Sequence, residues 1–376
     1  MRVLFVQPSL NPPGGGNAVA AWMVQALAAE HDVTVLTHTP ADLDAVNYHF
    51  GTSLQHDDAR WICTPIRVPR MLVLAGLNGA LLVNHRLSQH ARAIRSGFDV
   101  AVTANNESDI GAPTLQYVHY PKLDPTRPGG NGPRPLLVAA YQRAVAALTG
   151  FSHARARGNR TLANSKWTAG RLHSLGMAAT VLEPPVAMLA GTLPFDERED
   201  RFVAIGRIAP EKRLETIIEI VERLRARGWR SGLCLAGARD DAAYADRIAA
   251  LAAQRPWVEM RTDVSRPELT RILHHSRWSI HAMIDEHFGI AVAEMVRAGC
   301  MVFAHDSGGQ VEIVGDARLR WRDADDAVAK IEAVAADGRL RARLARSLAA
   351  RAAERDATVF AQKVQRLVRE VASGRT

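Results

Sequence analysis

The stretch MRVLFVQPSLNPPGGGNAVAAWMVQALAAEHDVTVLT, residues 1–37, decides the fold. It begins with an apolar run over residues 3–6 and continues through a turn that contains Pro12-Pro13-Gly14-Gly15-Gly16. A segment of helical period then covers residues 18–29, and a second apolar run covers residues 33–37. This order of strand, glycine-rich turn, helix and strand predicts a parallel β-α-β unit.

The same alternation continues along the chain and predicts an α/β protein with two doubly wound domains. In the first half, strands are predicted over residues 3–6, 33–37, 62–68, 100–103, 115–119, 160–164 and 180–183. After Pro184-Pro185, strands are predicted over 202–206, 233–237, 258–262, 279–282, 301–304 and 319–321, and helices over 213–227, 241–253, 266–275, 290–298 and 325–335. We therefore predict domains over residues 1–185 and 186–355, followed by a helical segment over residues 356–376.

Length and composition fit a soluble two-domain protein. The chain has 376 residues, of which 47% are hydrophobic and 23% charged. No run reaches the ~18 apolar residues that span a bilayer, and the N-terminus lacks the pattern of a secretory signal. Three isolated cysteines favour neither a disulfide framework nor a zinc site, so we expect a reducing cytoplasm.

The charge balance is basic and limits the choice of partners. The 47 Lys and Arg against 39 Asp and Glu give +8; residues 1–183 hold 16 basic and 11 acidic residues, which leaves 31 and 28 for the rest. Nucleic acid, an anionic membrane surface and a phosphorylated small ligand are the candidate partners. Aromatic residues are only 6%, with no basic stripe that carries them, so we expect no nucleic-acid partner.

The segment over residues 71–83 leaves membrane contact open. It is apolar apart from Asn78 and is flanked by Arg67, Arg70 and Arg86. A segment of this kind can lie on a membrane surface. The alternative that we favour is a helix buried in its domain.

Chemistry-bearing residues follow the predicted strand over 279–282. Glu286-His287-Phe288-Gly289-Ile290 leads into a helix that carries Glu294. Because the free amides at a helix start bind anions, a phosphate could lie over the amides of Phe288, Gly289 and Ile290, with one glutamate on each side. The alternative is a helix that is capped by its own acidic residues.

A second group follows the predicted strand over 202–206, in the run Gly206-Arg207-Ile208-Ala209-Pro210-Glu211-Lys212. Arg207 leaves the strand tip, and Lys212 opens the next helix, where the helix dipole disfavours a cation. One guanidinium and one ammonium would suit a diphosphate. An ordinary surface ion pair remains the alternative.

Two features of the first domain are expected at the carboxyl ends of its strands, where doubly wound folds bind ligands. Gly15 and Gly16 allow close backbone approach to a phosphate or sugar, although the turn is not GxGxxG and Thr37-His38 lacks the acidic residue of an NAD site. His119 ends the strand over 115–119. A flexible turn and a packed histidine are the respective alternatives.

Together these segments resemble the retaining glycosyltransferases of family four, which have the GT-B fold of two Rossmann-like domains facing across a cleft. The resemblance covers essentially the whole chain. It is most specific over EHFGIAVAEMVRAGC and AHDSGGQVEIV, and it extends to QYVHYP, LANSKWT and GRIAPEKR. The chain is especially similar to the dolichol-pathway α-1,2-mannosyltransferases and their bacterial relatives. It departs from close relatives at Gln310, where they often have proline.

The resemblance implies a role for each candidate residue. Glu286 would bind the donor sugar, and Glu294 the ribose diol. Arg207 and Lys212, with the amides after Phe288 (Gly289 and Ile290), would neutralise the departing diphosphate, so that neither a metal nor another cofactor is needed. His119 would assist at the reacting face, with Gly15 and Gly16 near the donor phosphates. The last helix would cross back onto the first domain.

The resemblance implies a nucleotide-sugar donor and a hydroxyl acceptor. GDP-mannose is the leading donor, and UDP-sugars are the alternative. The acceptor is a glycan, a lipid-linked sugar or a small molecule, and the expected location is the cytoplasm, with the inner membrane surface as an open alternative. A nucleotide-sugar epimerase, a phosphorylase and a non-catalytic sugar-nucleotide-binding protein are the rival functions.

Overall fold

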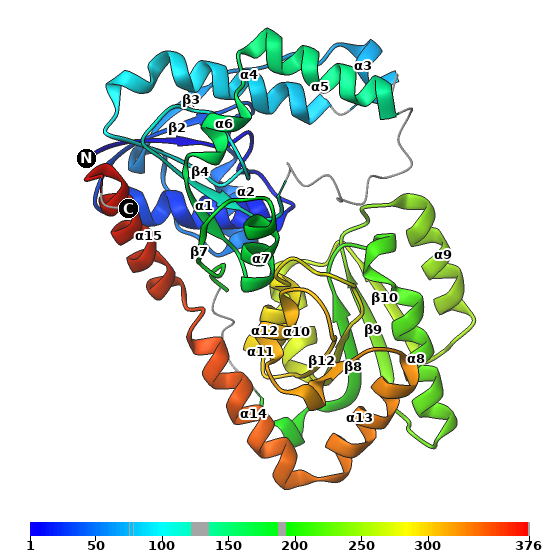
Figure 1. The fold of residues 1–376 in the computed structure, drawn as a ribbon. Helices are drawn as coiled ribbons and strands as arrows, with labels where there is room; N and C mark the ends of the chain where they lie inside the picture. Colours follow the sequence, from blue (N-terminus) through cyan, green and yellow to red (C-terminus); the bar gives the residue numbers. More distant parts are fainter. Residues whose placement is uncertain (75, 78, 122–134, 187–192, 375–376) are drawn as a thin grey trace. The chain divides into compact units, whose positions relative to one another are not determined.

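The computed structural model describes residues 1–374 apart from residues 75, 78, 122–134 and 187–192 (Figure 1). It divides into two compact units, an N-terminal unit of Met1–Pro185 with Ala357–Thr376 and a C-terminal unit of Val186–Asp356. Each unit is built around one parallel sheet, so the doubly wound α/β class predicted from the sequence is confirmed.

The N-terminal unit holds a seven-stranded parallel sheet in the order β3-β2-β1-β4-β5-β6-β7. The strands are β1 (Arg2–Val6), β2 (Asp32–Thr37), β3 (Arg60–Cys63), β4 (Val100–Thr103), β5 (Thr114–Val118), β6 (Arg160–Ala163) and β7 (Ala179–Val181). The prediction of a strand over 62–68 was wrong in its bounds. Pro65 lies inside that run and Pro69 directly follows it, and proline cannot donate a ladder hydrogen bond.

Helices cover both faces of this sheet: α1 (Gly15–Ala28), α2 (Leu43–Phe50), α3 (Arg70–Leu74), α4 (Gly79–Ile94), α5 (Pro135–Thr149), α6 (His153–Arg157), α7 (Lys166–Ser174) and α15 (Ala357–Ala372). Alternate residues of β1 point to opposite faces. Val3 and Phe5 pack with α1 and α15, whereas Leu4 and Val6 pack with α4 (Figure 1).

Helix α15 ends the chain on the N-terminal unit. Phe360, Val364 and Leu367 share one face of the helix, at the spacing of an amphipathic helix, and are buried beside α1. The Gln365 Nε2 atom donates to the Ala26 carbonyl oxygen at 2.9 Å. The final helix is therefore part of the N-terminal core.

The C-terminal unit holds a six-stranded parallel sheet in the order β10-β9-β8-β11-β12-β13. The strands are β8 (Glu199–Ile205), β9 (Gly232–Gly237), β10 (Val258–Thr262), β11 (Ser276–His281), β12 (Met301–His305) and β13 (Arg320–Trp321). The helices are α8 (Leu214–Ala226), α9 (Ala242–Ala253), α10 (Arg266–His275), α11 (Ile290–Arg297), α12 (Gln310–Val314), α13 (Ala324–Ala336) and α14 (Gly338–Ala353). Trp321, Phe202 and Phe303 are the largest fully buried side chains of its core.

The topology of the C-terminal sheet brings three loops together. Strand order reverses between β8 and β11, and β12 lies next to β11. Because all three strands are parallel, the loops that follow them leave the same edge of the sheet, at the switch point where doubly wound folds bind ligands. Within the described residues, no helix is long and apolar enough to span a bilayer.

Candidate functional site

A buried ion pair lies at the switch point of the C-terminal sheet. The Lys212 Nζ atom lies 2.6 Å from the Glu286 Oε2 atom, and each side chain is only 13% exposed. Lys212 ends the 3-10 turn Pro210–Lys212, two residues before α8 begins at Leu214, and is not inside the helix. Arg213 at the helix N-cap adopts a left-handed φ of 50°, which separates the turn from the helix. The loops after β8 and β11 therefore meet through opposite charges.

The electrostatics of this pair keep Glu286 ionised. Burial alone would raise the pKa of its carboxyl, but Lys212 and His281 outweigh burial and hold the pKa well below its usual range. The His281 Nε2 atom lies 3.3 Å from the same Oε2 atom. Burial lowers the pKa of His281, and Lys212 adds to this effect, while the hydrogen bond to Glu286 opposes it. The site holds a carboxylate that can accept hydrogen bonds from sugar hydroxyls.

The turn after β12 is hydrogen-bonded to the loop that carries Glu286. The Gly309 amide donates to the Glu286 carbonyl oxygen at 2.7 Å, and the Asp285 amide donates to the Ser307 Oγ atom at 2.7 Å. The buried Gln310 Nε2 atom donates to the Met283 carbonyl oxygen at 2.7 Å, and the Met283 Sδ atom in turn contacts Lys212 Nζ at 3.3 Å. Gln310 thus holds the segment after β11, which carries Glu286 and contacts Lys212 through Met283.

We expect Gln310→Leu to weaken the binding of nucleoside diphosphates about three- to tenfold, because the Met283 carbonyl loses a buried donor and the loop loosens. The melting temperature should change little, since leucine fills the same space and removes the buried Oε1 atom that has no hydrogen-bond partner. Calorimetric titration with GDP and UDP measures the effect. Gln365→Leu is the control, because it deletes an amide-to-carbonyl bond in the other unit; equal losses in both variants would contradict the prediction.

Arg207 lies beside this pair on the more exposed rim. Its guanidinium pairs with Glu211 at 2.9 Å and with Asp240, and its side chain is 47% exposed. Gly206 adopts a φ of 136°, and a Cβ atom on Gly237 of β9 would overlap the Gly206 carbonyl oxygen. The backbones at Gly206 and Gly237 therefore approach too closely for a side chain at position 237. This approach fixes the backbone of Arg207 at the end of β8.

Helix α11 begins beside the ion pair. Gly289 is its N-cap with a left-handed φ of 102°, Phe288 before it is buried, and Ile290 is the first helical residue. A Cβ atom on Gly289 would lie 3.4 Å from the Glu286 Cγ atom, so the loop folds back tightly onto the glutamate. The helix start and the carboxylate are neighbours, as an anion and sugar site requires.

Glu294 lies in the second turn of α11 and pairs with a residue that the sequence analysis did not select. Its Oε1 atom lies 2.6 Å from the Arg266 Nη1 atom, at the start of α10, and both side chains are largely buried. The ion pair fixes the direction of the carboxylate. Glu294 and Glu286 therefore face different partners, Arg266 in one case and Lys212 in the other.

In the N-terminal unit, Gly16 and His119 lie together. Gly15 is the first and Gly16 the second residue of α1, and a Cβ atom on Gly16 would lie 3.3 Å from the His119 Nε2 atom. That nitrogen is 2.9 Å from the Ala104 carbonyl oxygen, which can only accept, so it carries the proton. The His119 amide donates to the Asn106 Oδ1 atom at 2.7 Å, and Asn106 has a left-handed φ of 62°.

We expect Gly16→Ala to lower the rate of sugar transfer about tenfold, because the added methyl group displaces the imidazole by a few tenths of an ångström. Stability should hold, since alanine favours the helix. The rate is measured at saturating donor, with Gly170→Ala in α7 as the control, where a Cβ atom meets nothing within 4 Å. An unchanged rate for Gly16→Ala would contradict the role of His119.

The structure thus brings candidate residues together in two groups, one in each unit. Lys212, Glu286 and Gly289 lie in contact at the switch point, Arg207 flanks them, and Gly16 contacts His119 in the other unit. Sequence reasoning missed His281, Asn106 and Arg266, and it noted Gln310 only as a departure from close relatives. A histidine at the end of the strand before Glu286 was a visible signal, whereas nothing in the local sequence couples Arg266 to Glu294. Among the described residues, no three His, Cys, Asp or Glu side chains gather as a metal site.

Comparisons with known proteins agree with the fold described above. Residues 190–351 match the family model described as glycosyl transferases group 1. The chain is 24% identical over 357 residues to the GDP-Man:Man(3)GlcNAc(2)-PP-Dol alpha-1,2-mannosyltransferase of Mus musculus, across 82% of this chain and 73% of that protein. The chain has the GT-B fold, and its residues 190–351 form a domain similar to the glycosyl transferases of group 1.

Two further similarities extend the comparison. The Caenorhabditis elegans protein of the same name is 27% identical to this chain over 176 residues. These residues are 41% of this chain and 37% of the worm protein, so the match spans well under two thirds of that relative's length. The crystal structure of Anabaena Alr3699/HepE in complex with UDP and glucose superposes with a TM-score of 0.69 at 14% identity, across 98% of this chain and 99% of that one. At this identity the superposition supports the fold.

Proposed function

We propose that the protein is a retaining glycosyltransferase that moves mannose from GDP-mannose to a hydroxyl acceptor. The observation that carries the proposal is the buried pair of Lys212 and Glu286 at the switch point of the C-terminal sheet. A cation beside a carboxylate, next to a helix start, offers separate contacts for a diphosphate and a sugar. The similarity to proteins named as GDP-mannose-dependent mannosyltransferases favours mannose.

The diphosphate would bind Lys212, Arg207 and the amides that open α11. Because an ammonium has three N–H donors, Lys212 can contact a phosphate oxygen without releasing Glu286. Arg207 is exposed and paired with Glu211 and Asp240, so it can turn toward an incoming anion at the cost of surface ion pairs. Glu286 would accept hydrogen bonds from the sugar, and Glu294 from the ribose diol.

Transfer would proceed through an oxocarbenium-like state with retention at the anomeric carbon. The bond from this carbon to the diphosphate oxygen breaks, and the acceptor hydroxyl oxygen forms a bond on the same face. The acceptor proton passes to the departing phosphate. Lys212 and Arg207 stabilise the negative charge that develops on that phosphate, which makes them the main source of rate enhancement without a metal. His119 would contact the transferred sugar.

The acceptor is a glycan, a lipid-linked sugar or a small molecule. Peripheral contact with the inner membrane surface would suit a lipid-linked acceptor, which is the kind of substrate named for the mouse and worm relatives. A cytoplasmic location accords with three free cysteines, of which Cys234 and Cys300 are buried.

A second candidate is transfer from a UDP-sugar. The Anabaena structure, which holds UDP and glucose, favours it. In the proposed arrangement the side chains described above would contact only the diphosphate, ribose and sugar, so they would not distinguish guanine from uracil.

A panel of donors tests the proposal. Melting of the full chain is measured with GDP, GDP-mannose, UDP and UDP-glucose, because a ligand at about a hundred times its Kd stabilises the fold by about 2.7 kcal/mol. The expected result is a clear rise with GDP-mannose and a product of added hexose mass with a suitable acceptor. A rise in melting temperature with UDP-sugars alone would replace GDP-mannose as the assigned donor. No rise with any nucleotide would overturn the proposed function. Binding without turnover of any acceptor would indicate a non-catalytic binding protein.

A further inference from the structure

Helix α5 carries an apolar face that the described residues of its unit leave exposed. Its inner face is used: Tyr141 and Val145 pack with Leu82 of α4. On the outer face, Leu137 is 42% and Leu148 60% exposed. Exposed alanines at positions 140, 144 and 147 continue the stripe between them at helical spacing.

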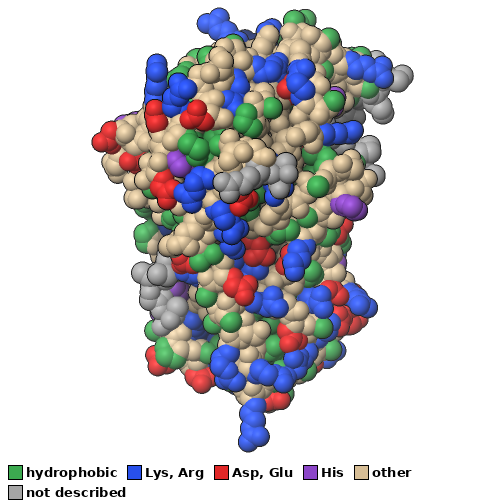
Figure 2. All heavy atoms as spheres, turned by 60° about the vertical axis from the view of Figure 1, so that its left-hand side comes forward, with side chains coloured by type: hydrophobic (Ala, Val, Ile, Leu, Met, Phe, Trp, Pro, Cys, Tyr) green, Lys and Arg blue, Asp and Glu red, His purple; other side chains and the backbone are tan. Residues whose placement is uncertain are grey.

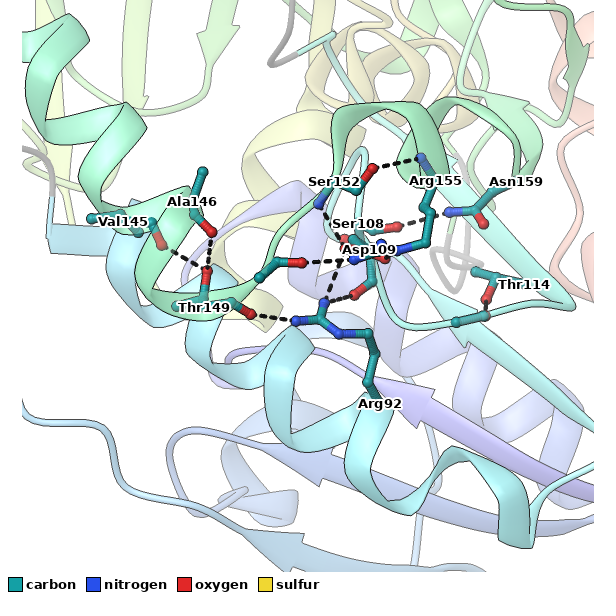
Figure 3. A network of polar contacts seen from close by, with 12 residues as sticks. Arg92, Ser108, Asp109, Thr114, Val145, Ala146, Thr149, Ser152, Arg155 and Asn159 are labelled. Carbon is teal, nitrogen blue, oxygen red and sulfur yellow. Dashed lines mark hydrogen bonds and ion pairs between the residues drawn. The ribbon is translucent and has the colours of Figure 1, made fainter.

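This helix is held rigidly at its C-terminal end by a buried polar network (Figure 3). The fully buried carboxylate of Asp109 pairs with Arg92 of α4 at 3.1 Å and with Arg155 of α6 at 2.7 Å. Arg92 also donates to the Thr149 carbonyl oxygen at the end of α5, and the Ser152 amide donates to Asp109. The outer stripe of α5 is thus presented on a fixed support.

Helix α3 adds two more exposed apolar side chains beside it. Leu72 packs against the α4 and α5 cluster, whereas Met71 is 73% and Leu74 88% exposed. Arg67 and Arg70 at the start of this segment are exposed as well. We call Met71, Leu74, Leu137 and Leu148, with Arg67, Arg70 and Arg143, the α3–α5 surface.

Apart from histidine, the charged residues of α3, α4 and α5 are all arginines. Residues 60–98 contain six arginines and residues 125–182 contain seven arginines and one lysine, and neither range contains any Asp or Glu. All eleven acidic residues of positions 1–183 lie outside these two ranges. In Figure 2, Lys and Arg side chains gather with hydrophobic ones at the upper end of the molecule, where α3, α4 and α5 lie.

We propose that the α3–α5 surface docks the protein on an anionic lipid bilayer. Exposed leucine and methionine side chains can enter the headgroup region, and the surrounding arginines are attracted by anionic lipid. A second copy of the chain would bring the same positive charge to the interface, which opposes self-association. The inference rests on the membrane contact proposed above and supplies its surface.

Vesicle co-sedimentation of the full chain tests the inference, with vesicles of phosphatidylcholine alone and with about one third phosphatidylglycerol. We expect binding to the anionic vesicles only, weakened by high salt. Arg70→Glu should reduce binding at least about fivefold, because each basic residue near the surface contributes about that factor. Leu74→Ser combined with Leu148→Ser should reduce it about tenfold or more.

Matched variants and a second readout separate the possible outcomes. Arg339→Glu on α14 makes the same charge change, and Tyr48→Ser on α2 removes a half-exposed aromatic side chain; both should bind vesicles like the unchanged chain. Nucleoside diphosphate affinity should stay unchanged in every variant, so loss of vesicle binding is distinguishable from loss of the proposed function. Equal binding by all variants, no binding to anionic vesicles, or dimers that Leu74→Ser with Leu148→Ser dissolves would overturn the inference.

Discussion

Lys212→Ala should lower sugar transfer by about a hundredfold to a thousandfold, the range found when one preorganised donor to a developing charge is removed. The reason is that its ammonium is the cation held at the switch point, 2.6 Å from Glu286. The rate of nucleoside diphosphate release in the presence of acceptor measures the effect. Lys212→Arg should recover only part of the activity, since a planar guanidinium does not fit the space of an ammonium.

The same substitution should also destabilise the fold, which would confound the rate unless it is separated. Removing Lys212 leaves the buried carboxylate of Glu286 with His281 as its remaining side-chain partner, and breaking a buried pair costs about 3–5 kcal/mol. Lys212→Ala combined with Glu286→Gln removes the uncompensated charge. We expect this double variant to regain much of the melting temperature and none of the activity. Recovery of both would show that the pair has only a structural role.

The second large effect is expected for Gly308→Ala, with a loss of about 3 kcal/mol in the free energy of unfolding together with most of the transfer activity. Gly308 has a left-handed φ of 71°, and an added Cβ atom would overlap the Glu286 carbonyl oxygen and lie 2.5 Å from its amide nitrogen. Neither backbone atom can move without shifting the loop that carries Glu286. Denaturant titration and the donor affinity measure the two losses.

Gly338→Ala is the control for this substitution. Gly338 opens α14 without a positive φ, and its Cβ atom would meet only the flexible end of Arg341, at 3.6 Å. We expect stability and donor affinity close to those of the unchanged chain. A Gly308→Ala variant that behaves in the same way would mean that the turn after β12 does not fix Glu286.

The fold was predictable because its signals are local. Apolar runs of three to seven residues separated by helical periods predicted both parallel sheets. The strand predicted over 62–68 was displaced because the apolar residues around Pro65 and Pro69 suggested a strand that proline cannot complete. These apolar runs do not indicate the order of the strands in each sheet. That order places the loops after β8, β11 and β12 side by side.

The site was predictable in its residues and not in its contacts. Lys212 and Glu286 were each selected from the residues that surround a strand end, but they are 74 positions apart, and nothing local states that they touch. The hydrogen bond from Gln310 to the Met283 carbonyl likewise depends on the pairing of β11 with β12. Tertiary contacts of this kind decide which charged side chains pair with each other, as Lys212 does with Glu286.

The most direct test of the account is the affinity of GDP and UDP for three forms of the full chain, measured by calorimetric titration. The account predicts binding of at least one nucleotide by the unchanged chain and by Arg339→Glu. For Lys212→Ala combined with Glu286→Gln it predicts an affinity about ten- to a hundredfold lower, the worth of a charge-assisted hydrogen bond. Equal affinity in all three forms would contradict the claim that Lys212 holds the diphosphate.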